Sequence, residues 1–178
     1  NASNRSLLAG LLFDDKGHPM TPSHTVKNGT GYRYYISRPL SAGVKASTHQ
    51  GRRIPAAEAD RLVVDRVRAF LADEAQIFDA TVMHTADLSE RQRLVRKAGE
   101  LAKTGPELSP ADARAILRAI VARIDIRVAE VEVHLAPLAL CDILSGGSLD
   151  PSITPASRKH TKILTVAVAA AFTRVGKN

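Results

Sequence analysis

The sequence has one cysteine among 178 residues, no tryptophan and only 4% aromatic residues. A single cysteine excludes an intramolecular disulfide framework and any metal site built from several thiolates. No apolar run approaches the roughly 20 residues that cross a bilayer. The first residues, Asn1 to Ser6, also lack the basic-then-apolar layout of a secretory signal. These absences favour a cytoplasmic chain that does not contact a membrane.

Several motifs that carry chemistry are also missing. The sequence contains no P-loop, no Gly-x-Gly-x-x-Gly, no His-Glu-x-x-His, no Cys-x-x-Cys and no Gly-x-Ser-x-Gly. Cys141 lies in an apolar run, which favours a small buried side chain over a nucleophile. We therefore predict that this chain has no catalytic residue and no metal ligand, and that it is not itself an enzyme.

What the chain does have is positive charge, concentrated at its two ends. The net charge is +7, and residues 1–53 hold eight Lys or Arg against two Asp or Glu. Residues 158–178 hold five basic residues and no acidic one, whereas the stretch between them is slightly acidic. Two solvated basic ends would explain this pattern. The alternative is that both ends face one polyanion, most commonly a nucleic acid, while the middle is scaffold.

The hydrophobic pattern predicts an α+β fold. Leu7 to Phe13, residues 19–26 and Tyr32 to Ile36 are expected to form a small antiparallel three-stranded meander, with a tight turn at Asn28-Gly29. A meander of this size needs support from other elements to be stable.

A helical segment of two to three helices is expected to follow. Apolar residues recur at helical spacing from Pro55 to Phe78 and again from Leu88 to Lys103, and Ser109-Pro110 reads as the start of a third helix. Ile124 to Leu135 alternates as a β-hairpin, and Thr161 to Phe172 is expected to be a strand. The predicted segments are 1–54, 55–122 and 123–178.

The aromatic and basic residues of the meander are the best candidates for a binding site. Alternation places Tyr32 and Tyr34 on one face, and Arg33 and Tyr35 on the other. One face can pack while the other offers a cation and a phenol to a phosphate backbone, although ordinary strand aromatics would give the same pattern. The predicted contacts to double-stranded DNA are His24, Thr25, Lys27, Arg33, Tyr35, Arg38, Arg52, Arg53, Arg158, Lys159 and His160.

The segment from Leu7-Leu8-Ala9-Gly10-Leu11-Leu12-Phe13 through Met20-Thr21-Pro22-Ser23-His24 to Tyr32-Arg33-Tyr34-Tyr35 resembles the recombinase zinc β-ribbon of large serine recombinases. More weakly, the Ile124 to Leu135 hairpin and Arg158-Lys159-His160-Thr161 are similar to later parts of that family. Asp14-Asp15-Lys16-Gly17 stands where the family has its Cys-x-x-Cys-Gly turn, and Ser37 stands near a later cysteine. The chain therefore looks like a ribbon without zinc and without any other cofactor.

The resemblance implies the DNA-binding C-terminal portion of a site-specific serine recombinase. The family's catalytic domain is not among these residues, so we expect this chain to be a piece of a longer recombinase. An alternative class is a protein-interaction module, in which the helices between Pro55 and Lys103, coiled-coil-bearing in the family, pair protomers into a homo-oligomer without touching DNA.

Overall fold

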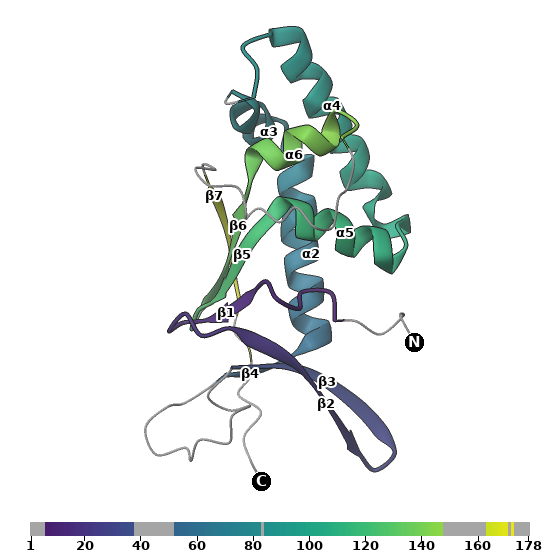
Figure 1. The fold of residues 1–178 in the computed structure, drawn as a ribbon, viewed down its shortest axis with the longest axis vertical. Helices are drawn as coiled ribbons and strands as arrows, with labels where there is room; N and C mark the ends of the chain where they lie inside the picture. The colour runs from purple at the N-terminus through teal and green to yellow at the C-terminus, as the bar shows by residue number, and fades with distance from the viewer. Residues whose placement is uncertain (1–5, 38–51, 83, 148–162, 171, 173–178) are drawn as a thin grey trace. The chain divides into compact units, whose positions relative to one another are not determined.

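The computed structural model describes residues 6–37, 52–82, 84–147, 163–170 and 172, and it has the α+β composition that the sequence predicts (Figure 1). In chain order, the described elements are β1 (Leu12–Asp14), β2 (Met20–Lys27), β3 (Thr30–Ser37), β4 (Arg53–Pro55), α2 (Ala56–Ala72), α3 (Glu74–Thr81), α4 (Leu88–Thr104), the 3-10 helix η2 (Gly105–Glu107), α5 (Pro110–Ile120), β5 (Val121–Ile126), β6 (Glu130–Leu135), α6 (Pro137–Leu144) and β7 (Leu164–Ala169).

The chain divides into two compact units. The first consists of residues 1–64, 123–132 and 167–178, and the second of residues 65–122 and 133–166. Element types change near residues 55 and 121, where the sequence places its segment limits. The three predicted segments themselves stay a prediction.

The first unit contains the β-meander, whose three strands are β2, β3 and β4 in that order. Its turn is the predicted one, because Asn28 and Gly29 have φ values of 52° and 75°. Two successive positive φ angles are the mark of the hairpin turns for which Asn-Gly is preferred. The base of the meander is apolar, with Met20, Tyr35 and Ile54 almost fully buried.

The membership of the meander differs from the prediction. Leu7 to Leu11 forms turns, and the strand there is only β1, which pairs in parallel with β5 from Leu12↔Ile124 to Asp14↔Ile126. The third strand of the meander is instead β4, paired with β3 through Tyr35↔Ile54. The parallel pairing gives Leu12 a place beside Ile124, and both side chains are buried. The residues around β1 contain no local pattern that predicts pairing with β5, which lies far away in the sequence.

Helices α3, α4 and α5 each begin after a residue whose side chain caps the helix. The single predicted helix from Pro55 to Phe78 is two helices, because Asp73 caps α3 by accepting a hydrogen bond from the Gln76 N–H at 3.0 Å. Within α3 it is Ile77 rather than Phe78 that is buried. Helix α4 and the Ser109 cap of α5 are confirmed.

A second sheet has the strand order β1-β5-β6-β7. The hairpin of β5 and β6 and the late strand β7 are both as predicted. Helix α6 forms from the apolar run around Cys141, for which the sequence predicts no helix. None of the described helices is long and apolar enough to cross a bilayer.

Candidate functional site

The β2–β3 hairpin is unusual in how much of it meets solvent. Among residues 21–34, only Ser23 and Tyr34 are half-buried, and the remainder are exposed. The hairpin is therefore a two-stranded ribbon with both sides open beyond its apolar base. It also lies in a part of the sequence with no acidic residue at all, since none occurs between Lys16 and Ala57.

The register gives the two sides of this sheet different chemistry. Residues paired across the strands share a side, and alternate residues of each strand do so as well. One side, called the hydroxyl face below, carries Thr21, Ser23, Thr25, Lys27, Thr30, Tyr32, Tyr34 and Arg53, together with the apolar Ile36 and Pro55. The other, called the core face, begins with the buried base of the meander and ends at the tip with His24, Val26 and Arg33.

Four of the predicted contact residues lie on the exposed ribbon: His24, Thr25, Lys27 and Arg33. They do not share one side. Lys27 belongs to the hydroxyl face, and His24 pairs with Arg33 on the core face. Arg33 also acts on the nearby Asp60 carboxyl and favours its charged form, so its positive charge is partly balanced.

Tyr35 corrects the prediction that placed it at the surface. The side chain is fully buried; its hydroxyl donates to Asp60 Oδ1 at 2.7 Å and accepts from the Leu8 N–H at 3.0 Å. Burial, reinforced by Asp60, raises the pKa of Tyr35. Burial also raises the pKa of Asp60, against the opposing effects of the Tyr35 hydrogen bond and Arg33. Tyr35 thus joins the N-terminal segment, β3 and α2, and it cannot touch DNA.

Arg52 and Arg53 are neighbours with different surroundings. The Arg52 guanidinium donates to the Arg127 carbonyl at 2.6 Å and lies 3.6 Å from Asp15, while its backbone N–H donates to Ser37 Oγ at 2.8 Å. Arg53 instead lies over the Tyr34 ring, 3.9 Å from the ring centroid. The structure therefore gives Arg52 internal partners and leaves Arg53 on the hydroxyl face.

The other predicted basic contacts, Arg38, Arg158, Lys159 and His160, lie outside the described residues.

The turn after β1, where the resemblance implies zinc, is organised by a carboxylate. Asp14 is 3% exposed and accepts hydrogen bonds from the N–H groups of Lys16 and His18 at 3.0 and 2.8 Å. Its second oxygen lies 3.2 Å from His18 Nδ1. Burial alone would raise the pKa of Asp14, but the hydrogen bonds from His18, Ser37 and Lys16 outweigh it and hold the pKa below its ordinary value.

These residues do not fit a zinc ribbon. Structural zinc takes four ligands, mostly thiolates and imidazoles. The turn offers no thiolate, and Asp14 Oδ1 already accepts from two backbone N–H groups while Oδ2 lies beside the His18 ring. Ser37, near the later cysteine position, accepts from Arg52 instead.

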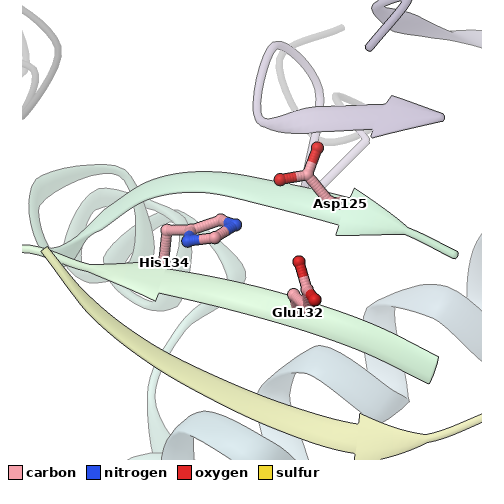
Figure 2. Close-up of side chains that lie close together, drawn as sticks. All are labelled: Asp125, Glu132 and His134. Carbon is pink, nitrogen blue, oxygen red and sulfur yellow. The ribbon is translucent and has the colours of Figure 1, made fainter. Parts of the chain in front are cut away.

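Figure 2 shows three further side chains of metal-ligating type: Asp125 on β5, and Glu132 and His134 on β6. The carboxylates are already occupied by ion pairs. Asp125 lies 2.7 Å from the Arg123 guanidinium, and Glu132 lies 2.8 Å from that of Arg127. We assign no metal to this group, because each carboxylate is neutralised by an arginine.

Cys141 is fully buried, as the sequence predicts. Burial raises the pKa of this thiol to about 11, so it stays protonated at neutral pH and is not a nucleophile.

The sequence reading missed two features of this site. The row of hydroxyl side chains at alternate positions of β2 is present in the sequence as Thr21, Ser23 and Thr25, of which only Thr25 is a predicted contact. The partnership of Tyr35 with Asp60 had no signal, because the two residues are 25 positions apart.

No family model matches this chain, and no curated protein matches its sequence. One solved structure with a similar arrangement is a crystal structure of an LSR–DNA complex, LSR standing for large serine recombinase. The similarity has a TM-score of 0.45 with 17% sequence identity, and it covers 73% of this chain and 55% of that one.

Proposed function

We propose that this chain is a module that binds double-stranded DNA through the β2–β3 ribbon. The observation that carries the proposal is the ribbon itself, which is exposed on both sides and contains cations but no carboxylate. The major groove admits a two-stranded β-ribbon, and Lys and Arg side chains bind phosphates beside it. Beyond its base this hairpin buries little surface within the protein. In this proposal it gains its contacts by entering a groove of the DNA.

The distribution of charge supports the same proposal. Residues of the first unit carry a net charge of +6, whereas those of the second carry only +1. Nearly all of the excess positive charge therefore belongs to the unit that bears the ribbon. Attraction to phosphates would supply most of the affinity, and contacts to base edges would add whatever sequence preference exists.

We further propose that the module is the C-terminal portion of a site-specific serine recombinase and positions a catalytic domain that is not part of these residues. Support for this second proposal comes from the sequence, in which the ribbon segment resembles the recombinase zinc β-ribbon of large serine recombinases. In this proposal the chain itself has no catalytic step. It also works without zinc, because the Asp14 hydrogen bonds hold the turn that a metal would otherwise hold.

The salt dependence of binding tests the DNA proposal. If about six phosphates are neutralised, a plot of log affinity against log salt should have a slope near −5. Fluorescence anisotropy with a labelled duplex measures this slope directly. Replacing Lys27 by Ala at the ribbon tip should reduce the slope by about 1. A slope near zero for the unaltered chain would refute the proposal.

A further inference from the structure

The two sides of the ribbon sheet differ in what they can offer a phosphate. On the hydroxyl face, Thr21, Ser23 and Thr25 recur at alternate positions of β2, and Tyr32 and Tyr34 lie opposite on β3. Serine, threonine and tyrosine hydroxyls donate hydrogen bonds to phosphate oxygens, which accept but never donate. This face has a row of such donors and no carboxylate that would compete for them.

The core face is less suited to the same partner. Its inner part is closed, since Met20, Tyr35 and Ile54 are buried. Toward the tip its cation is Arg33, whose charge already acts on Asp60. The His24 ring lies against the backbone at Gly31, where an added Cβ would sit only 3.0 Å from Nε2. Core-face residues are therefore engaged with the protein itself.

Arg53 is the cation of β4 that lies on the hydroxyl face, and its hydrogen bonding is incomplete. The guanidinium lies on the Tyr34 ring at 3.9 Å, and its Nη2 reaches Thr25 Oγ1 only at 3.4 Å. Among the described residues, Arg53 Nε is a buried side-chain atom that has no hydrogen-bond partner. Buried donors without partners are uncommon in folded proteins and call for an explanation.

The buried Nε is out of reach of an outside partner, but the outer end of the guanidinium is exposed and can donate to a phosphate group. Stacking on Tyr34 fixes the plane of the guanidinium, and a planar guanidinium matches phosphate oxygens with two parallel hydrogen bonds. Tyr34 contacts it from the neighbouring strand β3, and Thr25 reaches it from β2. The cation, the ring that orients it and a neighbouring hydroxyl thus form one preorganised group.

We propose that the hydroxyl face, centred on the Arg53–Tyr34 stack, contacts the phosphodiester backbone of duplex DNA, and that the core face does not. This inference rests on the proposed DNA binding and assigns it to one side of the sheet. Because backbone contacts carry no sequence information, loss of Arg53 should weaken binding by the same factor for unrelated duplexes.

The experiment compares Arg53→Ala with Arg33→Ala, which removes the same charge from the other side of the same sheet. We expect Arg53→Ala to weaken binding about tenfold for each of two unrelated duplexes, with the salt slope reduced by about 1. Arg33→Ala should weaken it by less than about threefold. Arg53→Lys should stay closer to the alanine variant than to the original chain, because lysine cannot make the paired hydrogen bonds.

A second variant keeps the test independent of folding. Thr25→Val removes a hydroxyl of the face without changing charge or size greatly, and we expect about a threefold loss of affinity. Circular dichroism and the melting temperature check that each variant is folded. Equal losses for Arg53→Ala and Arg33→Ala, or no loss for Thr25→Val, would overturn the face assignment while leaving DNA binding intact. An unaltered chain that binds neither duplex would instead refute the proposed function.

Discussion

At the scale of single residues, sequence neighbours have separate roles because a strand sends alternate side chains to opposite sides. Arg52 precedes β4 and makes its contacts with Asp15 and the Arg127 carbonyl, whereas Arg53 lies on the hydroxyl face above Tyr34. A count of basic residues would make Arg52 and Arg53 equal candidates for DNA binding. The contacts instead give Arg52 a role in stability, and they leave Arg53 as the candidate for binding.

Replacing Arg52 by Ala should therefore lower the free energy of unfolding by about 1 to 2 kcal/mol, because the Arg127 carbonyl loses a charged donor and Asp15 loses its partner. Urea unfolding measures this loss. The affinity of the folded variant for duplex DNA should change by less than about threefold. A variant of unchanged stability that no longer binds DNA would show that Arg52 contacts the nucleic acid after all.

At the scale of elements, a buried carboxylate organises the turn between β1 and β2. Asp14 accepts from two backbone N–H groups and lies beside His18 and Ser37, so one side chain joins the turn to the end of β3. A carboxylate hydrogen-bonded in this way can fix a short loop.

We expect chelation to leave this turn untouched. Adding EDTA should not change the melting temperature, and adding zinc should not raise it. Asp14→Asn should lower the melting temperature by roughly 4 °C, because the amide no longer accepts all of these hydrogen bonds. Asp15→Asn, one position along on a more exposed side chain, is the matched control and should cost far less. A fall in melting temperature with EDTA would show that a metal is present.

The lowered pKa of Asp14 also gives this effect a pH dependence. Its folded-state pKa lies below the ordinary 3.8, so the folded chain keeps the carboxylate charged where the unfolded chain takes up a proton. The stabilisation is complete above the ordinary pKa and is lost as the pH falls through the folded-state value. The Asp14→Asn variant should lack this part of the acid transition.

At the scale of the whole molecule, the chain combines a charged unit with a nearly neutral one. The ribbon and almost all of the net positive charge belong to the first unit, whereas helices α3 to α6 belong to the second. Pairing of protomers through the helical segment stays a prediction, and light scattering with and without DNA tests it.

The isolated chain should show no DNA cleavage or strand exchange. Its one cysteine is buried and protonated, and the carboxylates of Asp125 and Glu132 are held by arginines. Incubation with supercoiled plasmid and divalent cations, followed by gel electrophoresis, measures nicking. Turnover that copurifies with the chain and survives further purification would contradict the proposal.

The sequence alone determined the α+β class, the Asn28-Gly29 turn and the basic character of the ribbon. These features depend on local chemistry: left-handed backbone angles suit Asn and Gly, β-forming residues favour strands, and charge is simply counted. It also predicted α4, the Ser109 cap and the β5–β6 hairpin. These features are predictable because hydrophobic periodicity and helix capping depend on residues that are close together in the chain.

Only the tertiary structure decided which residues of the ribbon are free to bind. Period-two alternation showed that Tyr34 and Tyr35 face opposite ways, but not which way is inward, since either side could have packed. The burial of Tyr35 against Asp60 and Leu8, and the position of β4 beside β3 in place of β1 beside β2, settled that question. Both are contacts between residues far apart in the chain, and their energies depend on surfaces that exist only after folding.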